Sequence, residues 1–65
     1  MVDTSLSHRI RSEFLELPGL SLTPAQAARL WAIDRQTTDR VLNELAAAGF
    51  LFRNRVGLYL RRSAA

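Results

Sequence analysis

Residues 34–51, DRQTTDRVLNELAAAGFL, decide the fold of this 65-residue chain. When each residue advances by about 100°, as in an α-helix, one arc collects Thr38, Val41, Leu42, Leu45 and Ala48. Asp34 is placed to cap the start of a helix, and Gly49 stands where a left-handed residue commonly ends one. The segment therefore predicts an amphipathic helix over 35–48, with Phe50 packing back on its last turn.

A second helix is predicted immediately before the first. The segment TPAQ at 23–26 begins with a threonine that can cap a helix and continues with a proline suited to the first helical position. It ends with a glutamine that can reach back to the cap amide, which completes a capping box. The apolar side of this helix is formed by Ala27, Leu30 and Trp31. Only residues 32–34 separate the two helices, so we expect a tight turn with Ile33 between them.

The remaining segments predict one further helix and three short strands. A helical spacing over about 5–17 relates Leu6, Ile10, Phe14 and Leu17. Residues 20–22 (LSL) alternate as a strand does, and residues 50–62 (FLFRNRVGLYLRR) hold two apolar runs joined by the turn residues of 54–57. Because a lone two-stranded hairpin is marginal in water, the LSL segment is expected to be its third strand.

Length and composition limit the kind of protein this is. A chain of 65 residues forms one domain, and so small a domain buries only about 60% of the surface that its unfolded chain exposes. The chain has no cysteine, so we expect neither disulfides nor thiolate metal sites. The N-terminus lacks the pattern of a secretory signal, and no apolar run approaches the roughly 18 residues of a membrane span. We expect a soluble cytoplasmic protein that does not enter a membrane.

The formal net charge of +3 is concentrated at the C-terminal end. Residues 1–34 hold three arginines against four acids, whereas from residue 50 onward there is no acid and there are four arginines: Arg53, Arg55, Arg61 and Arg62. Four like charges without an acid repel one another unless a polyanion or an acidic partner screens them. This cluster indicates nucleic acid, with an acidic protein surface as the alternative.

The order of these elements resembles the winged helix-turn-helix family of bacterial DNA-binding domains. The most specific parts are LTPAQAARLWAIDRQTTDRVLNELAAAGFL at 22–51 and RNRVGLYLRR at 53–62, and the likeness covers nearly the whole chain. It implies an α+β, mostly α fold, with three helices and a short three-stranded antiparallel sheet. The elements then follow in the order helix, strand, helix, helix, strand, strand, and residues 1–65 form a single winged helix domain.

The resemblance also implies a role for particular residues of the helix over 35–48. As the recognition helix, it would enter the major groove of DNA. Gln36 would read adenine, Arg40 guanine, and Asn43 adenine or a phosphate. Arg35 and Thr37, near the helix N-terminus, would contact backbone phosphates.

The hairpin over 51–61 stands where the family has its wing. Arg55 at the tip would then enter the minor groove or hold a phosphate, with Arg53 on the adjoining strand as support. The resemblance thus implies a small transcriptional regulator that binds double-stranded DNA, as a homodimer or on clustered sites.

Charge on the predicted recognition helix departs from the family pattern. With its cap it holds two arginines against Asp34, Asp39 and Glu44, a net charge of −1. Asp39 would accept from a cytosine amino group or repel phosphate. Pairs four residues apart, Arg35 with Asp39 and Arg40 with Glu44, would alternatively be ordinary surface ion pairs. The competing hypothesis is a protein-interaction module that uses this fold on an acidic partner without DNA; RNA is a third option.

Aromatic and apolar residues are expected mainly in the core. Trp31 would pack inside, with a dimer anchor as the alternative, and the apolar face of the first helix would do the same. Tyr59 and Phe52 would cover the core from the hairpin, with stacking on bases as the alternative.

Nothing in the sequence indicates an enzyme. There is no glycine-rich phosphate loop, no obvious carboxylate pair, and no nucleophile at a recognisable spacing from His8. A single histidine without cysteine does not make a metal site. We therefore expect no catalytic residues, no metal and no cofactor.

Overall fold

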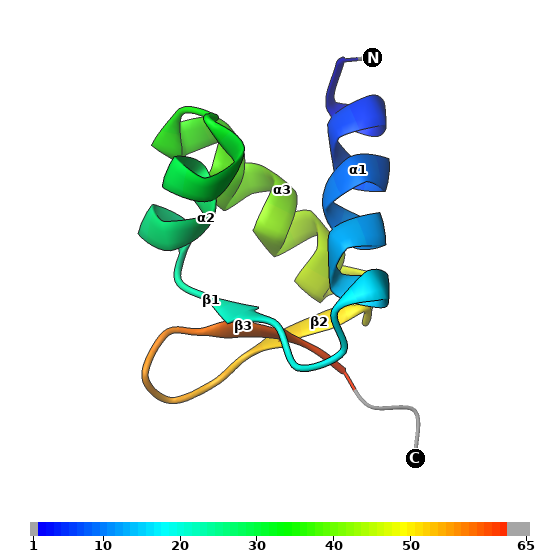
Figure 1. Ribbon diagram of the computed structural model, residues 1–65, viewed down its shortest axis with the longest axis vertical. Coiled ribbons are helices and arrows are strands. Elements are labelled where there is room, and N and C mark those ends of the chain that lie inside the picture. The colour runs from blue at the N-terminus through cyan, green and yellow to red at the C-terminus, as the bar shows by residue number, and fades with distance from the viewer. Residues whose placement is uncertain (1, 63–65) are drawn as a thin grey trace.

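Three helices and three strands follow one another in the predicted order in the computed structural model of this protein (Figure 1). The structure describes residues 2–62, with side chains from residue 6 onward. The elements are α1 (Val2–Glu16), β1 (Ser21–Leu22), α2 (Pro24–Trp31), α3 (Arg35–Ala47), β2 (Leu51–Arg53) and β3 (Tyr59–Arg61). The predicted fold class, a mostly helical α+β domain with a three-stranded antiparallel sheet, is confirmed.

Helix α1 begins earlier than its apolar spacing predicted, at Val2, and ends at Glu16. Ile10 and Phe14 are fully buried, as expected. Leu17 was expected on the same face, but its side chain is 51% exposed. It follows the last helical residue, where Pro18 and Gly19 turn the chain away, so the helical spacing no longer applies to it.

Helix α2 starts with the predicted capping box. The Thr23 hydroxyl accepts a hydrogen bond from the Gln26 amide at 3.1 Å, and the Gln26 side-chain oxygen accepts one from the Thr23 amide at 3.0 Å. Ala27 and Trp31 are buried, but Leu30 is 59% exposed, so its expected place in the core was wrong. The helix has only eight residues and buries a single i, i+4 pair, from which Leu30 is rotated by about 100°.

The turn between α2 and α3 is as tight as predicted. Ala32 adopts the left-handed conformation with φ 55°, and the amide of Ile33 donates to the carbonyl of Ala28 at 2.9 Å. Ile33 is partly buried against the core. Only Ala32 and Ile33 thus lie between the last residue of α2 and Asp34, the cap of α3.

Helix α3 buries the predicted arc, with Thr38, Val41, Leu42 and Leu45 inside. It ends one residue earlier than expected, at Ala47, and Ala48 is an exposed cap residue that does not reach the core. Gly49 follows with φ 87°, and the amide of Phe50 donates to the carbonyl of Leu45 at 3.0 Å. Together with the bond of 3.0 Å from the Gly49 amide to the Ala46 carbonyl, this bond forms the predicted Schellman stop, after which the chain enters β2.

Strand β3 lies in the centre of the sheet, between β1 and β2, and pairs antiparallel with both. The hairpin turn is held by Asn54, whose side-chain oxygen accepts from the amides of Val56 at 3.0 Å and Leu58 at 2.9 Å. Gly57 then takes a positive φ of 90°. In Figure 1 this hairpin, β2 to β3, projects past β1 on the side of α2.

The inner face of the sheet closes the core. Leu51 and Tyr59 are buried, whereas Phe52 is 37% exposed, so the expectation that Phe52 covers the core was wrong. Successive side chains of a strand point to opposite faces, and Leu51 takes the inner one. Under the sheet, the Phe14 and Trp31 rings meet edge to face with centroids 6.2 Å apart. Trp31 is thus a core residue.

None of the helices within residues 2–62 combines the length and the apolar character needed to cross a bilayer.

Candidate nucleic-acid interface

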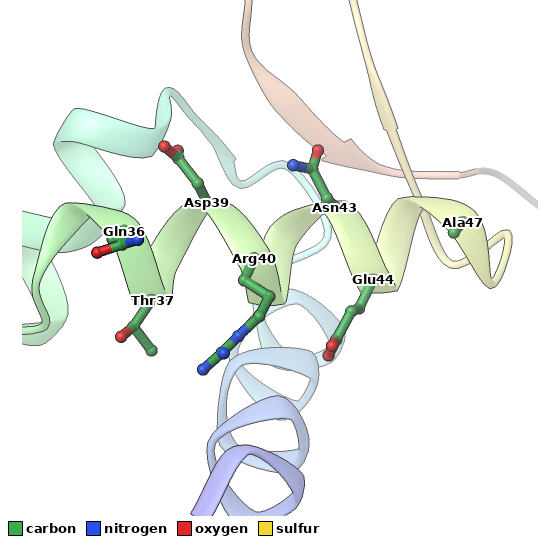
Figure 2. A pocket seen from close by; sticks show the side chains of 7 residues that line it. All are labelled: Gln36, Thr37, Asp39, Arg40, Asn43, Glu44 and Ala47. Atoms are coloured by element: carbon green, nitrogen blue, oxygen red, sulfur yellow. The ribbon is translucent and has the colours of Figure 1, made fainter.

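The outward face of α3 forms a shallow depression (Figure 2). The opposite face is packed in the core, and this outward face carries mainly polar side chains. The depression is lined by Gln36, Thr37, Asp39, Arg40, Asn43, Glu44 and Ala47. Four residues predicted to contact DNA are therefore brought together on one surface.

Asp34 caps the N-terminus of this helix. Its carboxylate accepts a hydrogen bond from the Thr37 amide at 2.9 Å. This bond, together with the Thr37 hydroxyl and the nearby charge of Arg40, holds the pKa of Asp34 below its ordinary value. The carboxylate is thus ionised at neutral pH and engaged by the helix itself.

Arg35 and Asp39 form an ion pair on the exposed surface, with Nε and Oδ1 3.2 Å apart. The two side chains are 60% and 44% exposed, so the pair adds only a few tenths of a kcal/mol to helix stability. This confirms the surface pair that the spacing had suggested as an alternative. It also places a positive charge directly beside the acid that would otherwise repel phosphate.

Arg40 projects from α3 on the same side as Thr37 and Glu44 (Figure 2). It is exposed, one turn beyond Gln36 along the helix. Its positive charge is the smallest of the effects that lower the pKa of Asp34, the residue that caps α3.

The side chain of Asn43 is hydrogen-bonded to the sheet. Its side-chain oxygen accepts a hydrogen bond of 2.7 Å from the Tyr59 hydroxyl on β3. Sequence reasoning missed this contact, although a buried tyrosine hydroxyl requires a partner and Tyr59 is only 4% exposed. The bond joins the exposed face of α3 to the hairpin.

Arg53 lies on the same side of the sheet as that contact. It is the register partner of Tyr59 across the strands, and directly opposed residues of paired strands share one face. Arg55 is exposed in the hairpin turn. Arg53 thus lies beside the contact that joins α3 to the sheet, and Arg55 lies two residues farther along the hairpin.

The other two arginines of the C-terminal cluster differ in their surroundings. The guanidinium of Arg62 lies over the ring of Phe52, 5.8 Å from its centroid. Arg61, the register partner of Leu51, is exposed at the end of β3. A similar contact places Arg11 of α1 over the ring of Phe50, 5.0 Å from the centroid. Neither stacking contact was expected from the sequence.

Comparison of the chain with protein-family models, with curated proteins and with solved structures found no match.

Proposed function

We propose that this protein binds double-stranded DNA, with α3 in the major groove and the hairpin arginines on the backbone, and that it acts as a transcriptional regulator. The observation that carries the proposal is the continuity of the two parts. The polar face of α3 is bonded through Asn43 to Tyr59, and Tyr59 stands opposite Arg53 in the sheet. A helix and a basic hairpin on one side of a small domain match the shape and charge of a duplex.

The exposed side chains of α3 suit a major groove. The groove is about 12 Å wide and admits one helix, whose side chains then reach the base edges. Gln36 and Arg40 are exposed one turn apart, and their donors and acceptors fit adenine and guanine respectively. These two residues are the proposed base contacts, and Arg35 and Thr37 the proposed phosphate contacts of the helix.

Two of the three acidic residues on α3 and its cap oppose this function less than their number indicates. Asp34 is occupied by the helix cap, and Asp39 is paired with Arg35. Their charges are thus largely balanced by the helix N-terminus and by an arginine. The arginines of the hairpin then supply the net attraction to phosphate.

The proposal is tested by titrating a labelled random-sequence duplex at about 50 and 200 mM salt. If Arg53 and Arg55 each neutralise one phosphate, while the charge of Arg35 is offset by Asp39, log K falls against log salt with a slope of about −1.8, a loss of about 12-fold over this range. No binding at the lower salt would contradict the proposal and favour an acidic protein partner.

An RNA duplex is the matched competitor in the same titration. The major groove of A-form RNA is too narrow for side chains to read, so a helix that enters the groove binds the DNA duplex more tightly. Equal affinity for the two duplexes would contradict the placement of α3.

A further inference from the structure

The hydrogen bond between Tyr59 and Asn43 determines which atoms of Asn43 remain for a partner. An asparagine amide has one acceptor oxygen and one NH₂ donor group. In this structure the oxygen accepts from the buried Tyr59 hydroxyl at 2.7 Å. Figure 2 shows the amide oxygen directed toward the hairpin and the nitrogen directed along the helix, toward Asp39. The donor group is therefore the part of the amide that faces the depression on α3.

The same bond makes rotation of the amide costly. Tyr59 is almost fully buried, and a buried hydroxyl that loses its partner bears a desolvation penalty. Among the described residues, no buried side-chain nitrogen or oxygen lacks a hydrogen-bond partner. Turning the Asn43 amide would bring its NH₂ group to the phenolic oxygen, and the buried phenolic hydrogen would then lose the acceptor that it has in this structure.

A free asparagine reads adenine by pairing its oxygen with N6–H₂ and its NH₂ with N7. The Asn43 oxygen keeps a second lone pair, but Figure 2 shows this oxygen directed toward the hairpin, so the two-bond contact with adenine requires the amide to turn and to break its bond to Tyr59. Guanine presents two acceptors, O6 and N7, at the same edge. At guanine, a fixed NH₂ group therefore faces two acceptors. At adenine it faces one acceptor, N7, and the N6 amino group, which is itself a donor.

We infer that Asn43 is a specificity-determining donor that selects guanine over adenine, and that Tyr59 is the residue that positions it. The inference rests on the proposed function, since it names the base edge read by the same surface. It also changes the sequence-based expectation that Asn43 reads adenine.

The test is site selection from a randomised duplex library with the full chain and four variants. Asn43→Ala first identifies the base position that Asn43 controls, because preference is lost there. At that position we expect the unsubstituted protein to prefer guanine over adenine about tenfold. Tyr59→Phe keeps the ring in the core but frees the amide, so the ratio falls and adenine is selected more often.

Two further variants separate this role from a merely structural one. Asn43→Asp still accepts from the Tyr59 hydroxyl but has no NH₂ group, so it loses the guanine preference while keeping the bond to the sheet. Val56→Ala alters an exposed residue of the hairpin turn and leaves the selected sequence unchanged. Circular dichroism of each variant verifies that it is folded.

Several outcomes would overturn the inference while leaving DNA binding in place. For the unsubstituted protein, this outcome is a preference for adenine at the position that Asn43 controls. For the variants, it is an unchanged ratio of guanine to adenine in Tyr59→Phe or a retained guanine preference in Asn43→Asp. The inference also fails if no base position responds to Asn43→Ala. In each case, salt-dependent binding to the random duplex persists, so the proposed function stands. If the unsubstituted protein binds no duplex at about 50 mM salt, the proposed function fails and the inference fails with it.

Discussion

Two residues with positive φ end the paired helices, and only one of them is a glycine. Gly49 follows α3 with φ 87°, and Ala32 follows α2 with φ 55°. A side chain in the left-handed region bears a steric cost that glycine does not have. Backbone strain is therefore present at Ala32, after α2, and absent at Gly49, after α3.

Exchanging the two residue types tests this difference. Ala32→Gly is expected to raise the free energy of unfolding by about 0.5 kcal/mol, after the greater freedom of glycine in the unfolded chain is subtracted. Gly49→Ala is expected to lower it by about 1 kcal/mol. An added Cβ at Gly49 meets no atom within 4 Å, so the effect comes from the backbone alone. Urea unfolding of both variants measures these changes in the free energy of unfolding. A loss of stability in Ala32→Gly would contradict the proposed strain at Ala32.

Asp34 makes stability depend on pH. The Thr37 amide holds the pKa of its carboxyl lower in the folded chain than in the unfolded one. The ionised form is thus stabilised by folding. That contribution is fully present above the unfolded pKa, about 3.9, and is lost as the pH falls through the lower folded pKa.

Asp34→Asn is the matched variant, because asparagine caps a helix but does not titrate in this range. We expect the urea midpoint of the unsubstituted protein to fall more steeply than that of Asp34→Asn between about pH 5 and pH 2. Parallel pH profiles for the two proteins would show that the cap contributes no pH dependence.

At the scale of elements, α3 and the hairpin act as one surface because strand pairing and the Asn43–Tyr59 bond hold them together. The hairpin contributes charge, and its two arginines lie on strand β2 and in the turn. The helix contributes groups suited to base edges. Substitutions in the two elements should therefore change different properties of DNA binding.

Charge removal in the hairpin should weaken binding to every sequence. Arg53→Gln with Arg55→Gln is expected to reduce the salt slope by about 1.8, which corresponds to two lost phosphate contacts. Arg9→Gln with Arg29→Gln removes the same charge from exposed positions on α1 and α2, outside the proposed surface, and serves as control. Titrations of a random duplex at four salt concentrations give both slopes. Equal changes in the two double variants would contradict a specific role of the hairpin.

Removing the negative charge of Asp39 on α3 should strengthen DNA binding. Asp39→Asn removes one negative charge from the exposed face of α3, and an exposed charge close to phosphate contributes about 1 kcal/mol. We expect random-duplex affinity at low salt to rise about fivefold, since 1 kcal/mol corresponds to that factor. Unchanged affinity would indicate that Asp39 lies away from the DNA, whereas weaker binding would indicate that it contacts a base directly.

The sequence predicted the elements of the domain and their order because local signals agreed along the chain. The capping box at Thr23 and Gln26 and the glycine stop at Gly49 are local in sequence, and both occur as predicted. Leu30 and Phe52 were misplaced because burial depends on which neighbour covers a side chain. That information is absent from the spacing of apolar residues within one short element.

The candidate site was predictable in part for the same reason. The residues on the outward face of α3 follow from helical periodicity, and the Arg35–Asp39 pair follows from their spacing. The contact between Asn43 and Tyr59 joins residues 16 positions apart on different elements. No local pattern connects them, so the direction of the Asn43 amide required the folded structure.

The small core should make folding and DNA binding measurably dependent on each other. A chain of 65 residues has a total stability of about 3–10 kcal/mol, and Phe14→Ala alone removes about 3–5 kcal/mol from a fully buried site. Phe14→Leu is milder, at about 1–1.5 kcal/mol, and leaves the chain folded with a lowered Tm. A partner that binds only the folded chain raises its stability by about 2.7 kcal/mol at 100 times Kd.

We therefore expect duplex DNA at that concentration to raise the Tm of Phe14→Leu by about 15 °C, because 1 kcal/mol shifts the Tm of a domain this small by about 4–8 °C. Thermal unfolding monitored by circular dichroism, with and without the duplex, measures the shift, and Arg53→Gln/Arg55→Gln in the same background provides a weakly binding control. A Tm that the duplex leaves unchanged would mean that the unfolded, arginine-rich chain binds DNA as tightly as the folded one. Binding would then require only the charge of the chain, and the arrangement of α3 and the hairpin would have no part in it.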